Sequence, residues 1–191
     1  MLDGVLNRWW HAKIDVEKWF DWYFDWLDRH VNPQTGYWQR AFWNLAWKRP
    51  TVNDMGGAVH FYWLYQARGR PFPYPEALIE STLGLQKPNG LYKKRPFCID
   101  LDGNFCLTRA YGQLPKATQN RWRGSVEAAV NKSALSILHF LAQENLTDAY
   151  PDSHGPPGAI IGLIECAKLE NSVWEDLLQG WQHPLDKVTW L

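Results

Sequence analysis

The sequence predicts an all-α protein built from pairs of helices. Apolar residues recur at intervals of three and four along several segments, and no segment shows the sustained alternation of a half-buried strand. Loops rich in Gly, Pro and Asn separate these segments. The chain has 191 residues, 46% hydrophobic and 21% charged, which suits one well-buried globular domain spanning residues 1–191.

The first two clear helices are expected at residues 15–30 and 53–69. Five aromatic and aliphatic residues at helical spacing give the first helix an apolar face, with three aspartates on the other side. These five are Trp19, Trp22, Tyr23, Trp26 and Leu27. Asn53 or Asp54 is a suitable N-cap for the second helix, and Gly69 is suited to end it.

Later helices follow from the same signals. Pro75 suits the first turn of a helix that runs to about Gln86. We expect another helix at 98–113 and one or two more within 118–146. The segment PDSHGPPGAIIGLIECAKL supplies a loop and an apolar helix, and SVWEDLLQGWQ predicts a last helix.

Two similar segments follow the helices at 15–30 and 75–86. The first reads HVNPQTGYW and the second LQKPNGLY, and their glycines, Gly36 and Gly90, are 54 residues apart. Glycine just past a helix end permits a positive φ. A fixed period of this length indicates a repeat of helical hairpins.

The second segment resembles a motif of a known superfamily. Gln86, Gly90 and Tyr92 match the pattern Gln-x3-Gly-x-Trp with Tyr in place of Trp. Gly36 and Trp38 match the end of the same pattern, although Gln34 is misplaced for its start. This motif is typical of the α/α-toroid superfamily, which includes terpenoid cyclases and protein prenyltransferase β-subunits.

The resemblance covers roughly residues 15–110 and, loosely, 153–168. It implies that the helical hairpins form part of an α/α toroid. A closed toroid needs more than the about seven helices that this sequence predicts. We therefore expect an incomplete ring, half of a homodimer that completes the ring, or a chain that lacks a further segment.

The segment CIDLDGN carries the candidate catalytic residues, Asp100 and Asp102. In class II terpenoid cyclases, which the chain resembles, a protonated Asp in an Asp-x-Asp-Asp motif is the general acid. Gly103 occupies the fourth position here, so the motif is incomplete. Burial among aromatic residues would raise the pKa of such a carboxyl group. The alternative is that one of these aspartates simply caps the helix.

An aromatic-lined cavity is expected because the chain contains 13 Trp residues, most of them in its first third. Aromatic faces can stabilise a cation or stack on a sugar. The expected substrate-binding residues are Trp22, Trp26, Asp54, His60, Tyr62, Trp63 and His154.

No cofactor is expected from the sequence, although zinc is the cofactor to consider. Prenyltransferase β-subunits, which the chain resembles, hold zinc with Asp, Cys and His, and lanthionine-forming cyclases on a similar toroid use two Cys and a His. Cys98 and His154 are the weak candidates here, because the sequence lacks Cys-x2-Cys and His-x3-His spacings.

These observations favour an enzyme that uses an acid to start chemistry on an apolar or isoprenoid-like small molecule. The alternatives are a carbohydrate-directed hydrolase or lyase, in which Asp54 and Asp100 form an acid/base pair on a sugar ligand, and a non-catalytic binding or scaffold domain.

Charge and composition limit the partners and the location. Lys+Arg and Asp+Glu both number 20, so the sequence lacks the basic field of a nucleic-acid-binding protein. No apolar stretch is long enough to span a membrane. Three Cys without a disulfide spacing fit a reduced cytoplasm.

Overall fold

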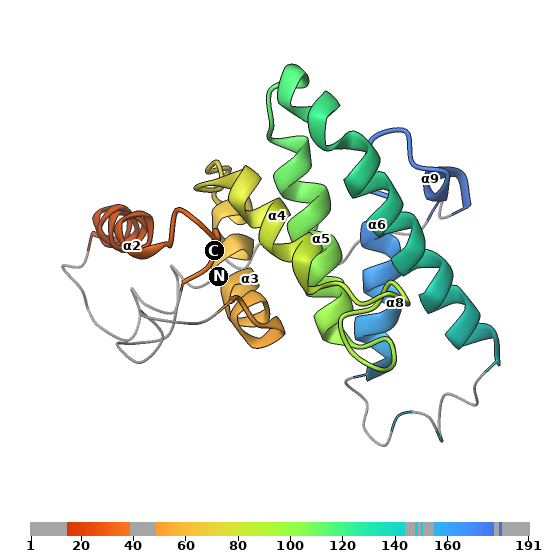
Figure 1. Cartoon of the computed structure of the whole chain (residues 1–191). Coiled ribbons are helices and arrows are strands. Elements are labelled where there is room, and N and C mark those ends of the chain that lie inside the picture. The colour runs from red at the N-terminus through yellow and green to blue at the C-terminus, as the bar shows by residue number, and fades with distance from the viewer. Residues whose placement is uncertain are drawn as a thin grey trace.

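The computed structural model describes residues 15–38, 49–143, 148, 150, 155–177 and 180, and these contain seven helices and no strand. The prediction of an all-α fold is confirmed. The helices are α2 (Val16–His30), α3 (Val52–Ala67), α4 (Pro75–Leu85), α5 (Cys98–Gly112), α6 (Lys116–Gln143), α8 (Gly155–Cys166) and α9 (Trp174–Leu177) (Figure 1). None of the helices described is both long and apolar enough to cross a membrane.

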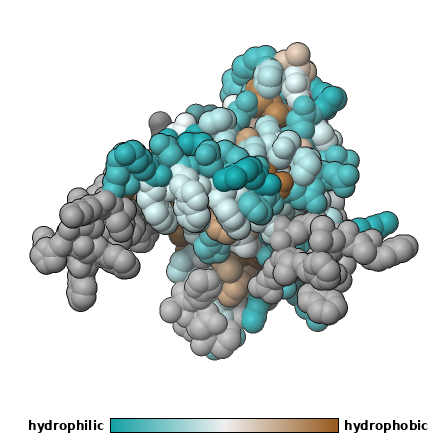
Figure 2. Space-filling model, turned by 90° about the vertical axis from the view of Figure 1, so that its left-hand side faces the viewer, coloured by the Kyte–Doolittle hydropathy of each residue, from teal (hydrophilic) through white to brown (hydrophobic). Residues whose placement is uncertain are grey.

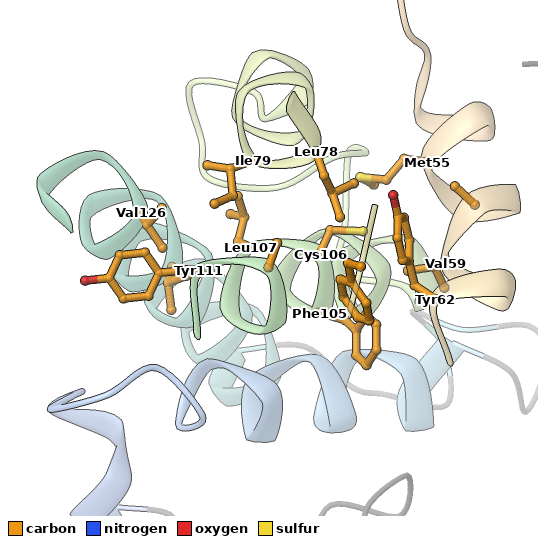
Figure 3. Close-up of a cluster of buried hydrophobic side chains, with 14 of the residues drawn as sticks. Met55, Val59, Tyr62, Leu78, Ile79, Phe105, Cys106, Leu107, Tyr111 and Val126 are labelled. Carbon is orange, nitrogen blue, oxygen red and sulfur yellow. The ribbon is translucent and has the colours of Figure 1, made fainter. Parts of the chain in front are cut away.

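Helix α5 is the centre of the fold. It packs against α3, α4, α6 and α8, and 12 of its 15 residues are buried. Figure 3 shows Cys106 and Leu107 of α5 beneath Leu78 and Ile79 of α4. A polar side chain on such a helix needs a bonding partner, because burying it without one costs free energy.

The helices around α5 form two layers. Gly158 of α8 contacts the backbone of Cys98, and Glu165 further along α8 bonds Arg109 further along α5, so these helices run in the same direction. Helix α3 also contacts α5, and Figure 3 shows it running across the axis of α5. Helices α4 and α6 contact each other and both cover α5, forming the second layer.

Glycines allow α5 and α8 to approach closely. A Cβ atom added to Gly158 would lie 2.6 Å from the backbone nitrogen of Cys98. One added to Gly162 would lie 3.1 Å from the nitrogen of Leu101. The close contact lets Asn104 of α5 donate a hydrogen bond to the Gly162 carbonyl, 3.1 Å away. Small residues at this spacing therefore determine how tightly the two helices pack.

The two similar segments make the same kind of connection. Gly36 (φ 71°) and Gly90 (φ 85°) both have the positive φ that the sequence predicts. A Cβ on Gly36 would lie 2.8 Å from Leu78 of α4, and a Cβ on Gly90 would lie 2.6 Å from the Lys132 carbonyl oxygen of α6. Gly36, which follows α2, thus packs against α4, and Gly90, which follows α4, packs against α6.

The side chains of the second segment complete this connection. The Gln86 amide donates to the carbonyl oxygens of Gly90 and of Ala129, each 2.9 Å away. The Tyr92 ring occupies the space where a side chain at Gly103 would stand, with a ring carbon 2.1 Å from the position of that Cβ. The motif therefore has a structural role: its side chains join the segment after α4 to both α6 and α5.

The predicted apolar face of α2 is only partly the face that the fold buries. The buried residues are Phe20, Phe24 and Leu27, and the Phe24 ring lies 4.9 Å from the Tyr65 ring of α3. Trp19, Trp22 and Trp26 are 43%, 58% and 41% exposed. Both faces of α2 are aromatic, so periodicity alone does not separate the buried Phe residues from the exposed Trp residues. Phe has no polar atom to satisfy in a dry contact, whereas the Trp N–H needs a partner.

The α2 side of the molecule faces the viewer in Figure 2. Hydrophilic and pale residues cover most of its described surface, and strongly hydrophobic ones appear only in small areas.

Candidate functional site

Asp100 anchors the loop that precedes α5. Its carboxylate is fully buried and accepts the backbone N–H groups of Tyr92 and Phe97, both at 2.8 Å. Burial raises the pKa of Asp100 to about 6, although the two N–H groups oppose this rise. Asp100 is therefore the aspartate that caps the helix: it is the third residue of α5, and its carboxylate accepts the N–H of Phe97, the residue before the helix.

Asp102 has a different environment. It is 6% exposed, and a Cβ added to Gly56 of α3 would lie 3.3 Å from its Oδ2 atom. The part of the chain that the structure describes offers no hydrogen-bond partner to this carboxyl. Burial, aided by the charge of Asp100 and opposed by that of Lys93, raises the pKa of Asp102 to about 8. At neutral pH the group is therefore mostly the neutral acid.

Aromatic side chains of α3 and α5 meet further along the contact between these two helices. The Trp63 ring meets the Phe105 ring edge to face, with centroids 6.4 Å apart, and the His60 ring lies 4.9 Å from that of Trp63. His60 is exposed, and its Nδ1 lies 2.8 Å from the Gly56 carbonyl oxygen. We call the set Gly56, His60, Trp63, Asp102 and Phe105 the α3–α5 seam.

The indole N–H of Trp63 is buried and has no hydrogen-bond partner among the described residues. Buried N–H groups are usually paired, so this one is an exception among the described residues.

Two of the other predicted substrate-binding residues have structural roles. The Asp54 carboxylate accepts the backbone N–H and the hydroxyl of Thr51, at 2.8 and 2.7 Å, in a capping box that begins α3. Tyr62 is fully buried, and its hydroxyl donates to the Gly36 carbonyl. These two side chains fix the ends of helices rather than line the seam.

The remaining predictions do not meet at the seam either. Trp22 and Trp26 stand on the exposed face of α2. His154 lies outside the described residues. The structure therefore brings together Asp102, His60 and Trp63, and does not add Trp22, Trp26, Asp54 or Tyr62 to them.

The described residues do not assemble a zinc site. No group of three or more His, Cys, Asp or Glu side chains among them could hold a metal ion. Cys98, the weak candidate, is a half-buried free thiol. Burial and the nearby charge of Asp102 raise the pKa of Cys98, which disfavours the thiolate that binds zinc.

Two features of the structure have only weak signals in the sequence. Gly56 provides the space that Asp102 occupies, and its only signal is a Gly-Gly pair inside a helical pattern. Glu165 is fully buried and bonds Arg109 and Thr108 of α5. A single acidic residue within the apolar segment GAIIGLIEC was the available signal.

Comparison with protein-family models, with curated proteins and with solved structures finds no match to this chain. The chemistry of the seam is therefore the basis for a function. A neutral carboxylic acid without a protein acceptor can transfer its proton to a bound molecule. Aromatic rings beside it suit an apolar molecule or a cation.

Proposed function

We propose that the chain is a toroid-superfamily enzyme that starts chemistry on an apolar, isoprenoid-like small molecule by protonating it from Asp102. The observation that carries this proposal is the nearly buried Asp102 carboxyl, which has no hydrogen-bond partner among the described residues and lies between α5 and α3, next to Gly56. The same two helices meet again at the ring contact of Trp63 with Phe105. The two layers of paired helices and the recurring glycine connections support the toroid part of the proposal.

The chemical step is a proton transfer. The O–H bond of the Asp102 carboxyl breaks, and its proton joins a double bond or an oxygen of the substrate. This leaves a carboxylate on the enzyme and a cation on the substrate. When the product cation loses a proton, the carboxylate takes it up, and the neutral acid is restored. No oxidant or further reactant is needed.

The environment of Asp102 suits this step in two ways. A pKa of about 8 keeps the carboxyl loaded with its proton at neutral pH. The ring of the partly buried Trp63 has an electron-rich face that attracts a cation, by an amount on the order of 2 kcal/mol where water is excluded. The fully buried Phe105 ring packs against it edge to face. The seam can therefore supply a proton and stabilise the charge that it creates.

The carbohydrate alternative has less support. It requires two carboxylates free to act as acid and base. Asp54 and Asp100 both accept backbone N–H groups that hold helix ends in place. Neither can be protonated without weakening its own cap. A non-catalytic domain would instead be folded and give no product from any substrate.

The experiment incubates the purified chain with linear polyprenes and prenyl alcohols and analyses products by gas chromatography and mass spectrometry. Asp102→Asn should lower product formation at least about 100-fold, because it removes the proton donor. Asp25→Asn, an exposed carboxyl of α2, is the matched control and should retain activity. Equal activity of Asp102→Asn and the wild type would exclude the acid role. No product from any substrate, with a folded protein, would favour the non-catalytic alternative.

The location and assembly are part of the same proposal. Three free cysteines, of which Cys106 and Cys166 are fully buried, support a reduced, cytoplasmic setting. The exposed Trp residues of α2 support self-association as a homodimer. A monomeric mass by light scattering at micromolar concentration would exclude the homodimer.

A further inference from the structure

The carboxyl-terminal ends of α3, α5 and α8 line an open, solvent-facing pocket of about 680 Å³. Its polar lining comes from the end of α3 and the loop after it (Gln66, Arg70), from the last turns of α5 (Thr108, Arg109) and from the segment after α8 (Lys168). No Asp or Glu is among the lining residues. A pocket of this size suits a small organic molecule rather than a single ion.

Three cationic side chains from three different segments line the pocket: Arg70, Arg109 and Lys168. Arginine presents a planar set of N–H donors that matches carboxylate and phosphate oxygens, and lysine adds a compact charge. Thr108 and Gln66 are neutral polar residues in the same lining. The chemistry of the pocket therefore favours an oxyanion.

A buried carboxylate holds Arg109 in position. The Nε and Nη2 atoms of Arg109 donate to the two oxygens of Glu165, at 2.6 and 2.9 Å. The Thr108 hydroxyl donates to the same carboxylate at 2.6 Å. Glu165 is fully buried and is not part of the lining, whereas the Arg109 side chain is 19% exposed. This arrangement fixes the guanidinium plane before a ligand arrives, which reduces the cost of binding.

Arg70 is also held from outside the lining. Its guanidinium lies 3.5 Å from the Asp28 carboxylate of α2 and 4.5 Å from the centre of the Phe24 ring. The carbonyl groups at three helix ends place partial negative charge near the pocket, which opposes an anion. Glu165 and Asp28 already balance much of the charge of the two arginines, so an anion would bind through their remaining N–H donors and the added charge of Lys168. Binding should therefore be moderate and sensitive to salt.

We propose that this pocket binds a small organic molecule through a carboxylate or phosphate group. The site goes beyond the proposed acid chemistry, because it involves none of the residues of the α3–α5 seam. Phe105 lies between Asp102 and Arg109 in the sequence of α5, and the Arg109 guanidinium stands 5.7 Å from its ring centre.

The test uses the full chain and three probes. Phenyl phosphate and benzoate carry the two oxyanions, and benzyl alcohol is the neutral counterpart of similar size. Isothermal titration calorimetry should give saturable binding of both anions with a Kd of about 1 mM. Benzyl alcohol should bind at least about tenfold more weakly. Added salt should weaken the binding of the anions.

Two lining substitutions and one control locate the site. Lys168→Gln and Arg70→Gln should each weaken binding of phenyl phosphate about tenfold. Lys94→Gln makes the same charge change as Lys168→Gln at an exposed position outside the lining, and should leave binding unchanged. Arg109 is left intact because its removal would strand buried Glu165.

Three results would overturn the proposal. They are the absence of saturable binding to the folded chain, equal binding of the neutral probe, and equal weakening by Lys94→Gln and Lys168→Gln. Circular dichroism of each variant establishes that the compared chains are folded. These results leave the role of Asp102 untouched, so the two proposals fail separately.

Discussion

Asp100 and Asp102 are two residues apart on α5, yet their carboxyl groups have opposite surroundings. Asp100 accepts two backbone N–H groups of the preceding loop, whereas Asp102 faces Gly56 of α3. Residues two apart on a helix point to different sides of it, which separates the two roles. One carboxylate holds the loop, and the other carboxyl is available for chemistry.

Asp102→Asn should remove part of the pH dependence of stability. The pKa of Asp102 is about 8 in the folded protein, above the ordinary value of about 3.9. The folded state therefore binds this proton more tightly than the unfolded state. Its contribution to stability is complete below about pH 4 and is lost as the pH rises to about 8.

Urea unfolding across this range measures the effect. The free energy of unfolding of the wild type should fall by roughly 2 kcal/mol between about pH 6 and about pH 8 because of Asp102. Asp100, whose pKa is about 6, adds little to this fall, because most of the stability linked to its proton is already lost below about pH 6. Parallel curves for Asp102→Asn and the wild type would contradict the assignment.

Asp100→Asn should destabilise the protein by about 1–3 kcal/mol at neutral pH. An amide can accept only one of the two N–H groups well, because its nitrogen is itself a donor. Hydrogen exchange should accelerate at the amides of Tyr92 and Phe97, which donate to this carboxylate. Asp25→Asn is the exposed control. Unchanged protection of both amides would show that the anchoring bonds contribute little.

Gly103→Ala should be among the most damaging small substitutions in the chain. The added methyl group would overlap the Tyr92 ring, and α5 is too enclosed to move away. We expect a loss of at least about 3 kcal/mol. Gly124→Ala on α6 has open space around the new Cβ and should instead stabilise the protein by about 0.5–1 kcal/mol. Thermal unfolding of both variants tests the contrast, and equal effects would refute it.

The two aromatic faces of α2 should respond differently to truncation. Phe24→Ala removes a buried ring and should cost about 3–5 kcal/mol. Trp22→Ala removes a larger side chain that is 58% exposed, and should cost less than about 1 kcal/mol. Urea unfolding of the two variants measures the difference. A larger loss for Trp22→Ala would mean that the sequence-based face is the packed one.

The positions of the helices could be predicted from local signals. Pro75 begins α4 as expected, and α5 ends within one residue of its predicted end. Gly36 and Gly90 follow their helices with positive φ, which glycine adopts easily because it has no Cβ atom. Local chemistry determines such features, so one sequence is enough to find them.

The site could be predicted only in part. CIDLDGN contains Asp102, the proposed acid, but the choice of Asp102 over Asp100 depends on which neighbour each one meets. The bond between Glu165 and Arg109 joins residues from helices that are distant in sequence, and periodicity cannot pair them. The buried face of α2 likewise depends on the shape of α3.

The enclosure of α5 has a consequence for synthesis on the ribosome. Translation delivers α5 first, then the whole of α6, and only afterwards α8 with Gly158, Gly162 and Glu165. Until then, Arg109 lacks its carboxylate partner and one side of the central helix has nothing to pack against. Nascent chains that end after α6 should therefore remain sensitive to protease and bind chaperones, and both properties should disappear once α8 has emerged.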